Sequence, residues 1–134
     1  QYLKTTSHRN FAIVDAAMND MLRPALYDTW LDILPISKRY VIESKTWDIV
    51  GPVCESGDFL GYQRNLAIKE RDILAVLSAG AYGSSMSSNY NSRCRAAEVI
   101  VDSDCIHLAR KRESFSDLII GENLLAKTEK SRAK

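Results

Sequence analysis

The sequence lacks the features that mark several large classes of protein. No apolar run approaches the roughly 18–20 residues that a membrane-crossing helix needs, and the first residues have no secretory signal pattern. Eighteen Lys and Arg residues oppose seventeen Asp and Glu residues, for a net charge of +1. This balance gives no support for binding nucleic acid or an anionic membrane. Hydrophobic residues are 46% and charged residues 26% of the chain, so a disordered or collagen-like chain is excluded.

The three cysteines, Cys54, Cys94 and Cys105, are an odd number and form no CxxC pair. This usage favours reduced thiols in a cytoplasmic protein over a disulfide framework or a zinc site. Patterns for a P-loop, GxSxG, HExxH or GxGxxG are also missing, so those enzyme classes receive no support. The 134 residues make about one ordinary domain. Because the chain opens on Gln1 without Met, we expect it to be part of a longer protein.

Short apolar runs predict strands. The runs Phe11–Val14, Trp47–Val50 and Ile73–Leu77 are typical of buried strands, the third buried on both faces. Glycines at positions 57 and 61 predict a loop after the second run. Ala97–Val101 and Cys105–Ala109 flank a short polar segment and predict a hairpin. The connections are too short for crossover helices, so we expect a mainly β fold, with antiparallel strands in a barrel or sandwich.

Two short helices are expected. Asn19 and Asp20 can cap the first, which tolerates Pro24 in its first turn. Ser114-Phe-Ser-Asp117 has the capping-box pattern and predicts a terminal helix over residues 114–126, followed by a flexible tail over residues 127–134.

Residues 78–91 differ in composition from the rest of the chain. They include two glycines, five serines, Tyr82 and Tyr90, with almost no aliphatic side chains. Such a segment cannot build a core. A flexible linker is the alternative, but tyrosines at this density favour a functional loop.

Cys54 and Glu55 place a thiol beside a carboxylate just after a predicted strand. A thiol with a reference pKa of about 8.5 holds a proton at neutral pH, and a neighbouring carboxylate disfavours the thiolate. This combination suits a proton donor more than a nucleophile. The alternative, which composition alone favours, is that Cys54 is a small buried hydrophobic residue.

Arg23 and Tyr27 are four residues apart, so on a helix they share a face and can jointly bind a carboxylate. The alternative is a surface arginine that lies over a tyrosine ring. Tyr82, which has only small neighbours, either presents its hydroxyl to a ligand or fills a gap in the core. His8 and His107 have no metal-ligand spacing, and we expect both to be structural.

Three longer strings resemble the diaminopimelate decarboxylase family in their order and approximate spacing. They are FAIVDAAMNDMLRPALY at residues 11–27, GPVCESGDFLG at residues 51–61 and SAGAYGSSMSSNYN at residues 78–91. The likeness continues through residues 93–101 and the terminal helix. The family implies a pyridoxal-phosphate enzyme of fold type III, with a TIM barrel and a C-terminal β-domain like that of alanine racemase. Residues 1–134 then correspond to the C-terminal β-domain, and the barrel with its cofactor-binding lysine is absent from this chain.

The resemblance implies a carboxy-lyase that converts meso-2,6-diaminopimelate to L-lysine and CO2, the last step of lysine biosynthesis. Cys54 matches the family's proton donor, and Glu55 matches the acid that pairs with the distal ammonium of the substrate. Arg23 and Tyr27 match residues that bind the distal end, and Tyr82 matches a residue that contacts both cofactor and substrate. The family implies a cytoplasmic homodimer in which Cys54 and Glu55 reach into the partner's site. This chain alone is therefore expected to be inactive.

Two alternatives remain open. Ornithine and arginine decarboxylases resemble this chain around the cysteine but usually carry Asp in place of Glu55. A non-catalytic β-domain that dimerises or regulates a partner would have no site of its own. The sequence departs from the family at Ser84, where we expect a bulkier apolar residue, and at Cys94, where we expect proline. Neither departure touches the proposed roles, and we expect Cys94 and Cys105 to be packing residues.

Overall fold

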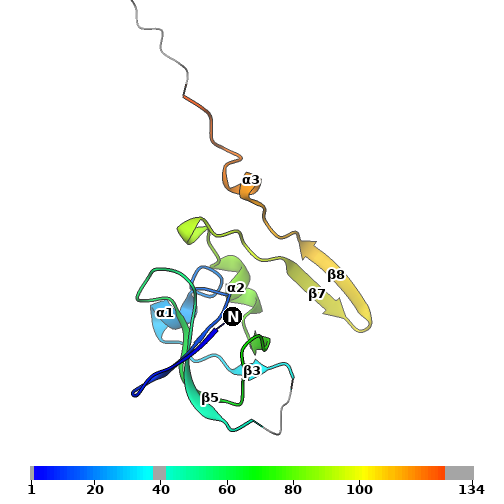
Figure 1. Ribbon diagram of the computed structural model, residues 1–134. Helices are drawn as coiled ribbons and strands as arrows, with labels where there is room; N and C mark the ends of the chain where they lie inside the picture. The colour runs from blue at the N-terminus through cyan, green and yellow to red at the C-terminus, as the bar shows by residue number, and fades with distance from the viewer. Residues whose placement is uncertain (1, 38–41, 126–134) are drawn as a thin grey trace, which may run out of the picture.

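A computed structural model describes residues 2–37 and 42–125 (Figure 1). The strands are β1 Tyr2–Thr5, β2 Asn10–Ile13, β3 Ile33–Pro35, β4 Lys45–Val50, β5 Phe59–Leu66, β6 Leu74–Val76, β7 Glu98–Asp102 and β8 Cys105–Arg110. The helices are α1 Arg23–Tyr27, α2 Gly80–Ser85, α3 Phe115–Leu118 and the 3-10 turn η1 Tyr90–Ser92. The prediction of a mainly β fold with short helices is confirmed. In the described ranges, no helix is long and apolar enough to cross a bilayer.

The described strands form one sheet in the order β1-β2-β4-β5 and two strand pairs, β3-β6 and β7-β8. Strands β2 and β4 are parallel, with Phe11 opposite Asp48 and Ile13 opposite Val50, whereas the other pairs are antiparallel. The expectation of antiparallel strands throughout is therefore wrong at this pair. The chain passes through α1 and β3 between β2 and β4, which gives it the length to return in the same direction.

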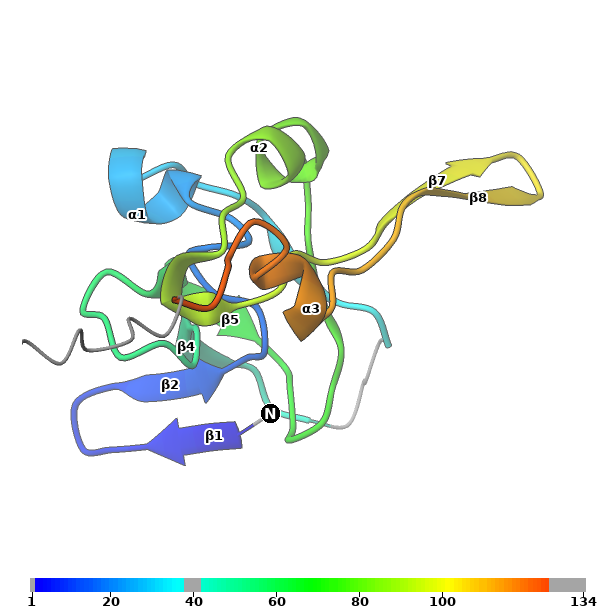
Figure 2. The same ribbon diagram turned by 90° about the horizontal axis from the view of Figure 1, so that it is seen from above.

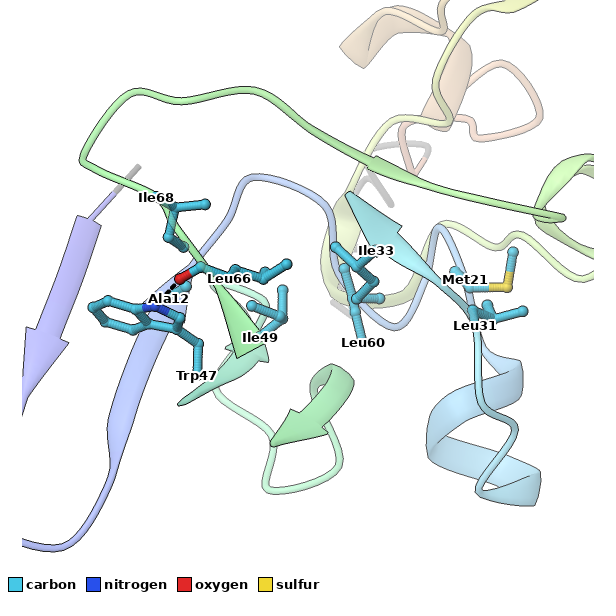
Figure 3. Packing of buried hydrophobic residues seen from close by; sticks show 9 residues of the cluster. All are labelled: Ala12, Met21, Leu31, Ile33, Trp47, Ile49, Leu60, Leu66 and Ile68. Atoms are coloured by element: carbon cyan, nitrogen blue, oxygen red, sulfur yellow. Dashed lines mark hydrogen bonds between the residues drawn. The ribbon is translucent and has the colours of Figure 1, made fainter. Parts of the chain in front are cut away.

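The hydrophobic core lies on one face of the four-stranded sheet (Figure 3). Ile49 of β4 and Leu60 of β5 are each only 1% exposed. Trp47 lies at one end of the cluster, where its indole N–H donates to the Leu66 carbonyl at 3.1 Å. The buried side chain of Ile33 joins β3 to this cluster. The core thus fixes β4 and β5, whose connecting loop carries Cys54 and Glu55.

Strand β5 occupies a region that the sequence predicts as a glycine-punctuated loop. Gly61 lies within the strand, and any Cβ there would overlap the Arg64 guanidinium. Arg64 is itself 5% exposed and stacks under the Trp30 ring, 3.1 Å from its centroid. The glycine therefore makes room for a buried arginine. The loop prediction holds over residues 51–58, which include Gly57, but it is wrong at Gly61, which has a packing role within the strand.

The run Ile73–Leu77 does form a strand, β6, but the expected burial on both faces is wrong. Its strand residues are only half-buried, and Ile73 is 68% exposed. Strand β6 pairs with β3 alone, so its other edge has no strand partner in the described structure.

The first helix, α1, has Pro24 in its first turn as predicted, but its expected caps act elsewhere. Leu22 is the N-cap residue and forms no side-chain cap. The Asp20 carboxylate instead accepts the Ala17 backbone N–H at 2.9 Å, and Asn19 is buried. Both side chains stabilise the turn before α1, so the prediction that they cap the helix is wrong.

The hairpin of β7 and β8 confirms the prediction, with a turn at Ser103–Asp104 that is one residue shorter than expected. Ser103 adopts the left-handed φ of 53°. The hairpin projects from the body of the domain in both views (Figures 1 and 2). Its apolar side chains, including Val101 and Ile106 at 68% and 77% exposure, have little cover in the described structure.

The terminal helix, α3, begins at the predicted capping box, where the Asp117 carboxylate accepts the Ser114 backbone N–H at 2.7 Å. It ends at Leu118, well before the expected residue 126. Ile119 and Ile120 are 57% and 86% exposed, and short helices depend on packing of an apolar face for stability. The expected tail over residues 127–134 lies outside the described residues.

Truncation of the core at Ile49 tests this packing. We expect Ile49→Ala to lower the free energy of unfolding by about 2–5 kcal/mol and Ile49→Val by about 0.5–1.5 kcal/mol, because each deleted methyl group leaves unfilled space. Urea denaturation of the complete protein measures both values. Equal effects of the two variants would contradict the close packing around Ile49.

Candidate active site

The loop between β4 and β5, residues 51–58, presents both Cys54 and Glu55 at the surface. Both side chains are exposed, so the alternative that Cys54 is a small buried hydrophobic residue is wrong. Backbone bonds close the loop: the Gly51 N–H donates to the Asp58 carbonyl at 3.0 Å and the Asp58 N–H to the Glu55 carbonyl at 3.1 Å. The thiol and the carboxylate are therefore carried on a tightly hydrogen-bonded turn.

Asp58 anchors this loop to the rest of the domain. One carboxylate oxygen accepts the Val53 N–H and the other accepts the Met18 N–H, each at 2.7 Å. Asp58 is 5% exposed, and hydrogen bonds from backbone N–H groups to a buried carboxylate are among the stronger ones. Any Cβ on Gly51 would overlap this carboxylate, so glycine at that position allows Asp58 to point inward.

Glu55 is held from two sides. Its Oε1 accepts from the Ser56 hydroxyl at 3.3 Å and the Gly57 N–H at 3.4 Å, and its Oε2 accepts the Tyr90 hydroxyl at 3.1 Å. These bonds, the Gly57 N–H foremost, lower the pKa of Glu55 below its ordinary value. The hydrogen bond between the Tyr90 hydroxyl and the Glu55 carboxylate raises the pKa of Tyr90. At neutral pH the pair is therefore an ionised carboxylate and a neutral phenol.

A second group of predicted site residues gathers where α1 meets α2. The Arg23 guanidinium lies over the Tyr82 ring, 4.3 Å from its centroid, and Tyr27 follows one turn later on α1. The expected alternative for Arg23, stacking on a tyrosine ring, does occur, but on Tyr82 of the serine-rich segment. Tyr82 is 48% and Tyr27 62% exposed, so neither fills a gap in the core. Figure 2 shows the two helices side by side.

Arg93 ties the serine-rich segment to the turn before α1. Its Nε donates to the Asn19 side-chain oxygen at 2.9 Å, its Nη2 donates to the Asp15 carbonyl, and the guanidinium lies 3.7 Å from the Asp20 carboxylate. Asn19, 2% exposed, also donates to the Ser88 carbonyl at 3.2 Å. This turn thus supports the Tyr90 segment through Arg93 and the Cys54 loop through the Asp58–Met18 bond.

The structure joins some of the predicted residues and keeps others apart. Cys54 and Glu55 lie together with Tyr90, and Arg23 lies with Tyr82. Within the described residues, no hydrogen bond or ion pair links the two groups directly. Segment 78–91 is partly helical, so the prediction of a loop is wrong over the residues of α2 and η1.

Sequence reasoning missed Tyr90, Asp58 and Arg93. The density of tyrosine in residues 78–91 was the only signal for Tyr90, because its contact with Glu55 spans 35 residues. Asp58 and Arg93 gave no signal, since isolated charged residues are usually solvated.

The cysteines and histidines form no metal site. All three cysteines are free, and in the described part of the chain no group of three or more His, Cys, Asp or Glu residues is placed to hold a metal ion. Cys94 is half-buried, whereas Cys105 is exposed on the hairpin. The prediction that Cys105 is a packing residue is therefore wrong.

Comparison with known proteins gives one consistent result. Residues 1–80 match the family model of the pyridoxal-dependent decarboxylase C-terminal sheet domain. The diaminopimelate decarboxylase of Pseudomonas aeruginosa is 56% identical over 93% of this chain, and that of Methanothermobacter thermautotrophicus is 48% identical over 90%. The chain spans about 30% of the length of the curated relatives it matches.

Solved structures agree with the sequence relatives. Diaminopimelate decarboxylase from M. jannaschii in complex with L-lysine superposes with a TM-score of 0.87 at 37% identity, over 92% of this chain and 28% of that one. The Helicobacter pylori enzyme, also complexed with L-lysine, gives 0.81 at 43% identity, over 89% of this chain and 29% of that one.

Substitution of Asp58 tests the anchor of the loop. We expect Asp58→Asn to lower the free energy of unfolding by about 1–3 kcal/mol, because the amide NH2 group faces a backbone N–H where an acceptor is needed. Amide hydrogen exchange at Val53 and Met18 is expected to accelerate. Asp104→Asn, on the exposed hairpin turn, serves as the matched control and should change stability by less than about 0.5 kcal/mol. Unchanged exchange at both amides would contradict the anchoring role.

Proposed function

This chain belongs to the pyridoxal-dependent decarboxylase family through its C-terminal sheet domain, and we propose that it is the C-terminal part of a diaminopimelate decarboxylase. The reaction converts meso-2,6-diaminopimelate to L-lysine and CO2. The observation that carries the proposal is the exposed Cys54–Glu55 pair on an anchored loop, with Glu55 held ionised. The relatives named above, all diaminopimelate decarboxylases, support it.

The chemistry that bound pyridoxal phosphate would supply is an electron sink for the decarboxylation. The residues present here fit contact with such a group, because the exposed Tyr82 phenol is backed by the Arg23 guanidinium at 4.3 Å. Tyr82 is the residue of this chain proposed to contact it. The lysine that anchors the cofactor is proposed to lie in the barrel domain, outside this chain. The chain alone is therefore proposed to be inactive.

Cys54 is proposed to deliver the proton that replaces the lost carboxylate. The S–H bond of the thiol breaks as the new C–H bond forms, and the thiolate later regains a proton from water. The exposed position of Cys54 on its loop allows it to reach a substrate carried on another surface. The anchoring of the loop by Asp58 limits the range of positions that the sulfur can occupy.

Specificity is proposed to come from the distal end of the substrate, which carries a second amino acid head group. Arg23 and Tyr27, on one face of α1, offer donors for the distal carboxylate, and the ionised Glu55 offers an acceptor for the distal ammonium. A compound that lacks the distal carboxylate leaves Arg23 without its partner, and sites of this kind reject such analogues strongly.

The proposal includes a homodimer with a shared active site. The two groups of site residues, Cys54 with Glu55 and Arg23 with Tyr82, have no direct polar link in the described residues. This separation supports their contribution to two different sites, one in each subunit.

A cytoplasmic location is also part of the proposal, and the three free thiols support it.

Two rival functions are less well supported. An ornithine or arginine decarboxylase would usually carry Asp in place of Glu55, and the curated relatives described above are named diaminopimelate decarboxylases. A non-catalytic dimerising domain gives no reason for an exposed thiol and an ionised carboxylate on one anchored loop. Treatment with pyridoxal phosphate and borohydride tests the proposed location of the anchor, because a stoichiometric lysine adduct within this chain would contradict it.

Removal of the thiol tests the donor assignment. In the complete protein, we expect Cys54→Ala to lower kcat for meso-diaminopimelate by about 10²–10⁴-fold with little change in KM, because only the proton-transfer step loses its acid. Release of CO2 and formation of lysine measure the rate. Cys94→Ala and Cys105→Ala are the matched controls and should keep wild-type kcat. Full activity of Cys54→Ala with an unchanged product would show that the donor lies elsewhere.

Shortening of the Glu55 side chain tests its proposed role in recognising the distal ammonium of the substrate. We expect Glu55→Asp to reduce discrimination between meso-diaminopimelate and ornithine, because the carboxylate is withdrawn by one methylene group from the distal ammonium. The ratio of kcat/KM for the two substrates measures the effect. A ratio identical to that of the wild-type protein would contradict the role given to Glu55.

A further inference from the structure

Tyr90 reaches Glu55 from a distant part of the chain. Its hydroxyl donates to Glu55 Oε2 at 3.1 Å, across 35 residues of sequence. The bonds that Glu55 receives within its own loop, from Ser56 and Gly57, are longer, at 3.3 and 3.4 Å, and both go to Oε1. Among the described residues, Tyr90 thus supplies the hydrogen bond to Oε2 and the contact from outside the loop.

The backbone around Tyr90 holds the phenol in place. Asn91 and Ser92, which follow it, both adopt left-handed conformations with φ of 61° and 55°. Asparagine tolerates this region, but a serine there is uncommon, and such residues persist only where their surroundings impose them. The next residue, Arg93, supplies that support through its bonds to the turn before α1.

We propose that Tyr90 is a positioning residue for substrate specificity, which orients the Glu55 carboxylate to receive the distal ammonium of the substrate. This inference rests on the proposed function. Tyr90 is 47% exposed and Glu55 is also exposed, and an exposed polar pair adds little to the stability of a fold. A purely structural purpose therefore explains the contact poorly, whereas orientation of a binding group explains it directly.

A phenol suits this task chemically. It donates one hydrogen bond to the carboxylate and leaves the remaining acceptor sites of both oxygens free for an ammonium group. It carries no charge, so it neither neutralises Glu55 nor repels a cationic ligand, as a lysine or arginine at the same position would.

The test compares Tyr90→Phe with wild type in the complete protein. We expect KM for meso-diaminopimelate to rise about 5–10-fold with kcat within about twofold, because the variant loses a hydrogen bond to a charged group but keeps the ring. The Kd for the product L-lysine should rise by a similar factor in calorimetry, because its α-ammonium group corresponds to the distal ammonium of the substrate. Tyr2→Phe, which removes an exposed phenol from β1, is the matched control. A fall in kcat without a change in KM or Kd would overturn the proposal.

The pH profile gives a second readout. Loss of the Tyr90 bond raises the pKa of Glu55, so the acidic limb of kcat/KM should move to higher pH in Tyr90→Phe. The other charged or titratable groups near Glu55 are Cys54 beside it and four residues that line the same hollow of about 470 Å³: Lys4, Arg9, Asp58 and Tyr62. Since the variant leaves all of these in place, the shift reports on the Tyr90 contact. An acidic limb at the wild-type position would count against the proposal.

A double-mutant cycle separates this inference from the function on which it rests. With Glu55→Gln as background, Tyr90→Phe should change KM and the Kd for L-lysine by less than about twofold, because its partner charge is gone. The same 5–10-fold effect in both backgrounds would show that Tyr90 acts independently of Glu55. If wild type itself does not decarboxylate meso-diaminopimelate, the proposed function fails and the inference fails with it. A wild type that does so, with Tyr90→Phe unaltered, overturns the inference alone.

Discussion

The buried carboxylate of Asp58 is the constraint on which the arrangement of this domain's surface depends. It accepts two backbone N–H groups at 2.7 Å, one from its own loop and one from the turn before α1. A buried carboxyl group is costly unless it is hydrogen-bonded, so the two segments must stay together. Gly51 leaves the space that this carboxylate fills. The position of Cys54 and Glu55 thus follows from a polar contact beneath them.

The turn before α1 extends this constraint to the second segment of the site. Asn19 and Asp20 in that turn bind Arg93, which follows the strained pair Asn91 and Ser92. Through these contacts, three stretches far apart in sequence form one supported surface. Loops held by a rigid scaffold are common places for binding and catalytic groups. Here the four-stranded sheet supplies the scaffold, and the buried polar contacts fix the loops on it.

The success of sequence reasoning depended on how local each signal was. The hairpin of β7 and β8 and the capping box at Ser114 were predicted correctly, because neighbouring residues specify both. Strand β5 was missed, because its glycine and buried Arg64 do not follow an alternating apolar pattern. The parallel pairing of β2 with β4 was also missed, since it depends on the path of the chain through α1 and β3.

For the site, the sequence by itself determined which chemical groups the chain offers: a thiol beside a carboxylate at residues 54 and 55, and the Arg23–Tyr27 spacing on a short helix. The family to which the chain belongs was also recognisable from its strings. Only the tertiary structure decided that Tyr90 contacts Glu55, that Arg23 stacks on Tyr82, and that Asp58 ties the Cys54 loop to Met18. These contacts join residues far apart in the chain. Their geometry depends on packing and on buried hydrogen bonds, which no local pattern encodes.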